Sequence, residues 1–258
     1  MAKIESGSVS RRGFLKSGAL LAGASALGFS GVFGLRTARA ADDDIPTILS
    51  IAATAEAFAV THYLAAINSK IPFTAAQKAY LRAGLESEYD HLQFLMANGG
   101  KMLTDKFYIP TGTFASTKSF GAVTAIAETV FVGAYLAATR RFAELNQPLL
   151  AATAAQVAVI EGQHLALVRE IGGEFPNNLA LAEPLFYNVS DAVAVVQPLL
   201  DGKKGGLGEM DKDPVPYPSE DKIKAAIGKS ALKPGVMPFT EMKAGGMMAA
   251  TMEPTVAK

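Results

Sequence analysis

An internal duplication constrains the fold of this 258-residue chain more than any other feature. The run AEAFAVTHYLAA at residues 55–66 and the run AETVFVGAYLAA at residues 127–138 share their Ala-Glu, Val and Tyr-Leu-Ala-Ala positions. A second matched pair follows, EYDHL at residues 88–92 and EGQHL at residues 161–165. The chain therefore contains two copies of one unit, and each copy has a lone Glu in one segment and Glu-x-x-His in the next.

The segments around these motifs have the periodicity of amphipathic helices. From about residue 45 to residue 172, apolar residues recur every three or four positions, and no alternating strand pattern competes with them. Thr74 followed by Gln77 predicts a capping box, and Pro148 suits a first helical turn. Gly, Pro and cap residues divide the region into four predicted helices, at about residues 45–69, 74–98, 119–146 and 148–172.

The lengths of the connections predict how these helices pack. Only a few residues separate the first helix from the second and the third from the fourth, which favours two antiparallel hairpins. About twenty residues, 99–118, join the second helix to the third. At roughly 3.3 Å per residue, such a segment can run the length of a bundle. We therefore expect an all-α fold, a four-helix bundle of two hairpins joined by one long crossover.

The repeated Glu and His residues predict a metal site inside this bundle. Residues three apart lie on one helix face, so Glu88 and His91 point the same way, as do Glu161 and His164. A single Glu-x-x-His is commonplace on a solvated helix face, whereas two copies matched to two Ala-Glu helices are not expected by chance. A buried, unpartnered carboxylate costs several kcal/mol, and metal ligation would relieve that cost. Four carboxylates and two imidazoles suit two iron or two manganese ions.

Over about residues 45–172 the chain resembles the ferritin-like dimetal-carboxylate bundles, including the desiccation-related ferritin-like group. The resemblance implies one Glu from each of two helices and Glu-x-x-His from each of the other two. Glu88 is then one candidate bridging ligand, and either Glu128 or Glu161 is the other. The implied ligands are Glu56, Glu88, His91, Glu128, Glu161 and His164.

Two tyrosines and one further histidine lie close to these motifs. Tyr63 and Tyr135 each follow a lone Glu by seven positions, on the same helix face two turns along. They are candidates for hydrogen-bond donors behind the ligands or for redox-active phenols, and core packing explains them equally well. His62 corresponds to Ala134 in the repeat, so it has no symmetric role, and we expect a surface or core histidine.

The N-terminus resembles a twin-arginine export signal. The run SRRGFLK at residues 10–16 precedes an uncharged stretch, residues 17–35, and the small-x-small site ARA at residues 38–40. The alternative is a retained membrane anchor, because the uncharged stretch approaches the roughly 20 residues that span a bilayer. We expect residues 1–40 to be a signal peptide read by the twin-arginine translocase. The mature protein would then reside in the periplasm or cell envelope.

The remaining segments predict a bundle at residues 41–175, short accessory helices at 176–201 and a flexible Gly/Pro/Met-rich tail at 202–258. Five methionines in the last stretch of the tail, residues 237–252, suggest either an apolar arm that docks on a partner chain, as in a homodimer, or a Cu(I) site. The chain has no cysteine, which excludes disulfides and thiolate chemistry. Its 24 basic and 24 acidic residues give no basic field for nucleic acid.

Together these features predict an exported dimetal protein with redox chemistry. The resemblance implies an oxidoreductase of the ferroxidase, peroxidase or manganese-catalase type, which acts on ferrous iron, O2 or peroxide during oxidative or desiccation stress. Two alternatives come from other classes of protein. One is a structural, stress-protective bundle that the metals lock, and the other is a protein that delivers metal ions.

Overall fold

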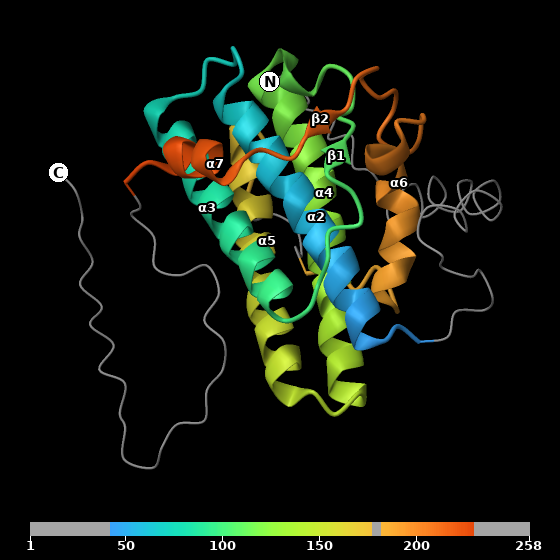
Figure 1. The fold of residues 1–258 in the computed structure, drawn as a ribbon. Helices are drawn as coiled ribbons and strands as arrows, with labels where there is room; N and C mark the ends of the chain where they lie inside the picture. Colours follow the sequence, from blue (N-terminus) through green and yellow to red (C-terminus); the bar gives the residue numbers. More distant parts are fainter. Residues whose placement is uncertain (1–41, 177–181, 230–258) are drawn as a thin grey trace, which may run out of the picture.

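Four long helices form the body of the protein (Figure 1). The structure is a computed structural model that describes residues 42–176 and 182–229. α2 packs against α3 and α4 packs against α5, while the two hairpins contact each other less closely. The predicted all-α bundle of two hairpins is confirmed. The helices are α2 (Ile45–Ile67), α3 (Ala75–Ala97), α4 (Thr117–Glu144) and α5 (Pro148–Ile171).

Three of the four long helices, α2, α3 and α4, begin at residues whose side chains satisfy free backbone N–H groups. The Asp44 carboxylate accepts a hydrogen bond of 2.9 Å from the N–H of Thr47 at the start of α2. Thr74 and Gln77 form the predicted capping box of α3, each side chain accepting from the other residue's backbone N–H. Pro148 occupies the first turn of α5, where its missing N–H costs nothing.

The crossover between α3 and α4 runs along the bundle beside α2 (Figure 1). It contains the two-residue strand β1 (Lys106–Phe107) and the short 3-10 helix η2 (Thr113–Ala115). The N–H of Leu103 donates to Thr54 Oγ1 at 2.9 Å, which attaches the crossover to α2. At Gly100 a Cβ would lie only 2.7 Å from a carbonyl oxygen of α2, so this close approach requires glycine.

The C-terminal part of the described chain covers the bundle with short elements. The 3-10 helix η3 (Val189–Ala192) and helix α6 (Val193–Asp201) pack beside α2 and α4, where short helices were predicted. After Gly202 the sequence predicted extended or flexible chain, but the structure contains two further elements there. They are β2 (Val215–Pro216), which pairs antiparallel with β1, and α7 (Glu220–Ile227), which packs on α3 (Figure 1).

Two expectations concern residues outside the described ranges. The export signal falls on residues 1–40, and the five methionines in the last stretch of the C-terminal tail fall between residues 230 and 258.

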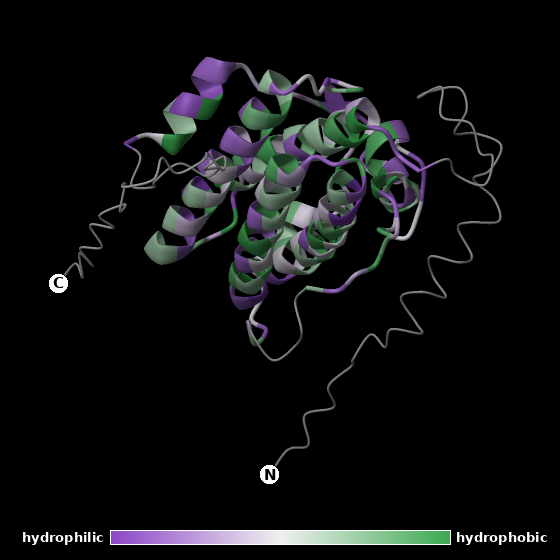
Figure 2. Ribbon diagram, turned by 90° about the horizontal axis from the view of Figure 1, so that it is seen from below, coloured by the Kyte–Doolittle hydropathy of each residue, from purple (hydrophilic) through white to green (hydrophobic). Residues whose placement is uncertain are grey.

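The hydrophobic core lies where the helices face one another, and hydrophilic residues lie mainly on the outer sides and at the ends (Figure 2). Among the described residues, α2 and α4 are long and apolar enough to cross a membrane by length and composition alone. However, 83% of the apolar window of α2 and 61% of that of α4 are buried inside the fold. Their apolar character is therefore explained by core packing.

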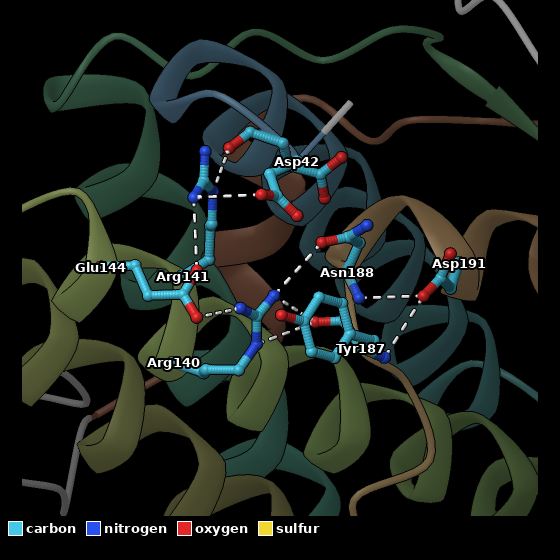
Figure 3. Close-up of polar contacts among 8 residues, drawn as sticks. Asp42, Arg140, Arg141, Glu144, Tyr187, Asn188 and Asp191 are labelled. Atoms are coloured by element: carbon cyan, nitrogen blue, oxygen red, sulfur yellow. Dashed lines mark hydrogen bonds and ion pairs between the residues drawn. The ribbon is translucent and has the colours of Figure 1, made fainter. Parts of the chain in front are cut away.

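Two arginines near the end of α4 attach the segments that flank the bundle (Figure 3). The Arg140 guanidinium donates to the Tyr187 carbonyl at 2.7 Å and to Asn188 Oδ1 at 3.2 Å. It also lies 3.6 Å from the centre of the Tyr187 ring, a cation–π contact. Arg141 Nε donates to the carbonyl of Asp43 at 2.8 Å. These contacts hold the chain before η3 against α4 and so help to place α6 over α2 and α4.

Candidate metal centre

Six ionisable side chains meet in the interior of the bundle. α2 and α4 each contribute one glutamate, and α3 and α5 each contribute a Glu-x-x-His pair. The least buried of the six is only 7% exposed. All six of the predicted ligands are therefore brought to one site; they are Glu56, Glu88, His91, Glu128, Glu161 and His164.

The six residues form two overlapping groups of possible metal ligands. In each group, one nitrogen or oxygen atom per residue lies within 4.8 Å of the corresponding atoms of the others. Both groups contain Glu88 and Glu161. The first group adds Glu56 and His91 of the α2–α3 hairpin, and the second adds the equivalent pair of the α4–α5 hairpin. Two neighbouring sites that share two carboxylates are the arrangement expected for a bridged pair of metal ions.

The shared glutamates resolve an alternative left open by the sequence. Glu88 belongs to both groups, in agreement with its predicted bridging role. Of the two partners considered for it, Glu161 is also shared, whereas Glu128 falls in the second group alone. Glu88 and Glu161 are therefore the two carboxylates common to both groups, and they would be placed to bridge two bound ions.

Both imidazoles turn their Nδ1 atoms toward these carboxylates. His91 Nδ1 lies 3.2 Å from Glu88 Oε2 and 3.2 Å from Glu161 Oε1. His164 Nδ1 lies 2.8 Å from Glu88 Oε1 and 3.0 Å from Glu161 Oε2. Each histidine thus reaches a glutamate of its own helix, three residues earlier, and a glutamate of the opposite hairpin. The site joins the two hairpins, which contact each other less closely than the two helices within each hairpin do.

Two tyrosines hold the lone glutamates from the opposite hairpin. Tyr63 of α2 donates a hydrogen bond of 2.6 Å to Glu128 Oε1 of α4, and Tyr135 of α4 donates to Glu56 Oε1 of α2. Burial raises the pKa values of both phenols well above the usual range, and the nearby carboxylates add to the shift. Both tyrosines are therefore protonated donors at neutral pH. Each contacts a candidate ligand rather than serving only as core packing.

The lone glutamates are strongly perturbed acids. Burial raises the pKa of Glu56 well above its ordinary value, and the charges of Glu88 and Glu161 raise it further. The pKa of Glu128 is raised well above its ordinary value for the same reasons. In the absence of metal, both lone glutamates therefore keep a proton to higher pH than an exposed glutamate does.

Glu88 and the two histidines show the opposite balance of forces. Burial acts to raise the pKa of Glu88, but the charges and hydrogen bonds of His164 and His91 hold it well below its ordinary value. Burial acts to lower the pKa values of both histidines, yet the surrounding carboxylates raise them well above the ordinary range. The metal-free cluster is thus held together by imidazolium–carboxylate pairs.

Several atoms of this cluster make no hydrogen bond of regular geometry with the described residues, although Glu88 Oε1 and Glu161 Oε1 each lie within ion-pair distance of a histidine nitrogen. They belong to four different glutamates and one histidine, and all are buried. Leaving such groups unpaired is costly, and divalent cations would satisfy the carboxylate oxygens together. The donor set of carboxylate oxygens and imidazole nitrogens fits iron or manganese. The atoms without a regular hydrogen bond are Glu56 Oε2, Glu88 Oε1, His91 Nε2, Glu128 Oε2 and Glu161 Oε1.

His62 is a core residue, one of the two alternatives that the sequence left open. It is 2% exposed, and its Nε2 lies 2.9 Å from Thr124 Oγ1. Its ring stacks on Phe120 and Phe58, with ring centres 5.4 and 5.5 Å apart. Burial lowers the pKa of His62 to about 4, so the ring is neutral at physiological pH. Neither group of possible metal ligands includes it.

Comparison with known proteins agrees with this geometry. A family model described as "Ferritin-like domain" matches residues 44–174, a range that contains all four long helices and all six clustered residues. No curated protein and no solved structure matches the chain.

Proposed function

The chain belongs to the ferritin-like domain family, and from that premise we propose that it binds two iron or two manganese ions and carries out redox chemistry on ferrous iron, O2 or peroxide. One observation carries the proposal above all others. Two groups of buried ligands share Glu88 and Glu161, and the cluster atoms that make no regular hydrogen bond belong to residues of these groups. A site made only to lock the bundle would need neither a shared pair of carboxylates nor so many unsatisfied oxygens.

When bound, two such ions supply two electrons together, the number that converts dioxygen to peroxide or peroxide to water. The protein supplies position and protons. Tyr63 and Tyr135 fix one oxygen of each lone glutamate, so that the other oxygen is left for the interior of the site. Because the ligands are buried, bulk water is kept from the centre, and the charges of the carboxylates act at full strength.

We further propose that the protein is exported by the twin-arginine route and acts in the cell envelope under oxidative or desiccation stress. The paired arginines, the uncharged stretch and the small-residue site of residues 10–40 support export. The twin-arginine route moves folded proteins, and a bundle whose ligands are all buried is suited to being loaded with metal before export.

A loading and turnover experiment tests the redox function. Metal-free protein is loaded with Fe(II) or Mn(II) without oxygen, analysed for bound metal and then exposed to O2 or peroxide. We expect bound metal and turnover in the natural chain, and loss of both in Glu161→Gln. Glu170→Gln is the matched control, because Glu170 lies on the same helix but is exposed. Bound metal without turnover would favour the structural role, and absence of bound metal would refute the proposal.

A further inference from the structure

An apolar cavity of about 50 Å³ lies between α2, α4 and the η3–α6 segment. Its lining is almost entirely hydrocarbon. The two lining residues with hydroxyl groups direct them elsewhere. The Thr54 hydroxyl donates to the Ser50 carbonyl and accepts from the N–H of Leu103, and the Tyr135 hydroxyl donates to Glu56. The cavity therefore offers its contents no free hydrogen-bonding side chain among the described residues.

The position of the cavity connects the protein surface with the candidate metal centre. Its lining includes Leu103, which is 40% exposed, and Tyr135, which is 6% exposed. The Tyr135 ring forms part of the cavity wall, and its hydroxyl group holds the candidate ligand Glu56. Along α4 the lining extends from Val130 to Ala138, about 12 Å at a rise of 1.5 Å per residue. A molecule in this cavity is separated from a ligand of the centre by one aromatic ring.

The internal repeat shows that this space is specific to one half of the bundle. The cavity is lined by Ala52 of α2 and Ala134 of α4. In the other half, the repeat places Thr124 at the position of Ala52 and His62 at the position of Ala134. These two side chains contact each other, and the His62 ring is packed between aromatic rings that fill the equivalent region. One half is therefore filled where the other is left open.

The chemistry of the walls restricts what can occupy the cavity. A single water needs about 10–15 Å³ of such space, so several would fit, but water needs polar partners that are missing here. A ligand with a polar head group would likewise find no partner inside, and hydrogen peroxide would lose the hydrogen bonds that it makes in water. Small molecules without polar groups suffer no such penalty, and an apolar cavity of this kind binds xenon or benzene.

We propose that this cavity is a binding site for dioxygen, from which the candidate metal centre receives O2 past Tyr135. The inference rests on the proposed redox function and narrows it, because it selects O2 rather than peroxide as the oxidant that reaches the centre by this path. It also assigns a role to the small residues Ala52 and Ala134, which leave this space open.

Xenon binding and oxidant choice test this inference with the full chain. The cavity is filled by Ala134→Phe, with Val196→Phe as a second filling variant from α6, because both residues line the cavity. Ala122→Phe is the control, because Ala122 lies on α4 at an exposed position. A crystal structure under xenon pressure should show xenon in the cavity of the natural chain and of the control, but not in the filled variants.

The kinetic arm compares two oxidants on iron-loaded protein. In the filled variants we expect oxidation of Fe(II) by O2 to slow on the order of tenfold, while oxidation by hydrogen peroxide stays at the rate of the natural chain. Absence of xenon, or equal slowing with both oxidants, would overturn the dioxygen site while leaving the redox function intact. Displacement of xenon by dodecanoate at micromolar concentration would identify a hydrocarbon-chain site instead and would also overturn it. Failure of the natural chain to oxidise iron with either oxidant would overturn the redox function and this inference together.

Discussion

Metal binding to this protein is predicted to release protons, and the structure indicates which groups release them. In the metal-free cluster, two groups hold protons because their carboxyl pKa values are raised, namely Glu56 and Glu128. Two more protons belong to the imidazolium forms of His91 and His164, whose pKa values are also raised. A metal ligand must be deprotonated. Loading both sites should therefore release protons from these carboxyl and imidazole groups, at most four per chain.

The charge balance of the loaded centre is consistent with this number. Four carboxylates carry four negative charges, and two divalent ions carry four positive charges, so the buried centre becomes neutral after the protons leave. A net buried charge would be strongly disfavoured. Isothermal titration calorimetry in two buffers of equal pH and different ionisation enthalpy measures the proton count directly. Absence of proton release at pH 6 would refute the raised pKa values of these four groups.

The same protons determine the pH dependence of the metal-free fold. The unfolded chain loses the protons of the two lone glutamates above about pH 4.5 and those of the two histidines above about pH 6.5. Because their pKa values are raised in the fold, the folded cluster keeps these protons to higher pH. Their stabilising contribution is present below those values and is lost as the pH rises through the folded pKa values, at about 1.4 kcal/mol per pH unit for each proton. The metal-free protein should therefore melt at a lower temperature at pH 9 than at pH 6. Bound metal should remove this loss, because it replaces the protons.

Three further predictions concern single residues. Tyr135→Phe removes the donor to Glu56 and should weaken metal binding at one of the two sites roughly 10- to 100-fold, as measured by metal titration. Equal weakening at both sites would contradict the assignment of Tyr135 to Glu56 alone. Gly121→Ala should destabilise the fold by about 1–3 kcal/mol in urea unfolding, because a Cβ there would lie 2.5 Å from a backbone Cα at the end of α5. Gly162→Ala is its control and should be neutral or stabilising by up to about 1 kcal/mol, since nothing lies within 4 Å of its Cβ position. The depressed pKa of His62 makes the fold lose stability between pH 6.5 and pH 4, at about 1.4 kcal/mol per pH unit. His62→Phe should flatten this loss in the pH dependence of the unfolding free energy. An unchanged dependence on pH would show that His62 is not the group responsible.

Features that depend on local sequence were predictable. The Thr74–Gln77 capping box and Pro148 at the start of α5 depend only on neighbouring residues, and both lie where the sequence placed them. The six clustered residues were predictable because helical periodicity fixes their faces and the repeat supplies symmetry. In these helices the local preference for helix and the packing of the bundle favour the same structure.

Features that depend on how the hairpins dock were not predictable from sequence. The Tyr63–Glu128 bond crosses from one hairpin to the other, and helix periodicity placed Tyr63 only on the face of its own Glu56. The strand β2 has two residues, too few for an alternating pattern, so its pairing with β1 left no sequence signal. The apolar cavity likewise arises from small residues on α2 and α4 and from the way α6 covers them. In the sequence, only the comparison of His62 with Ala134 in the repeat indicates this cavity.

The central claim is that one buried cluster holds two metal ions through a shared pair of glutamates. A crystal structure of protein loaded with Fe(II) or Mn(II), recorded with anomalous scattering, tests it most directly. We predict two peaks inside the bundle, one next to Glu56 and His91 and the other next to Glu128 and His164, with Glu88 and Glu161 in contact with both. A single peak, or metal bound only outside this cluster, would contradict the claim.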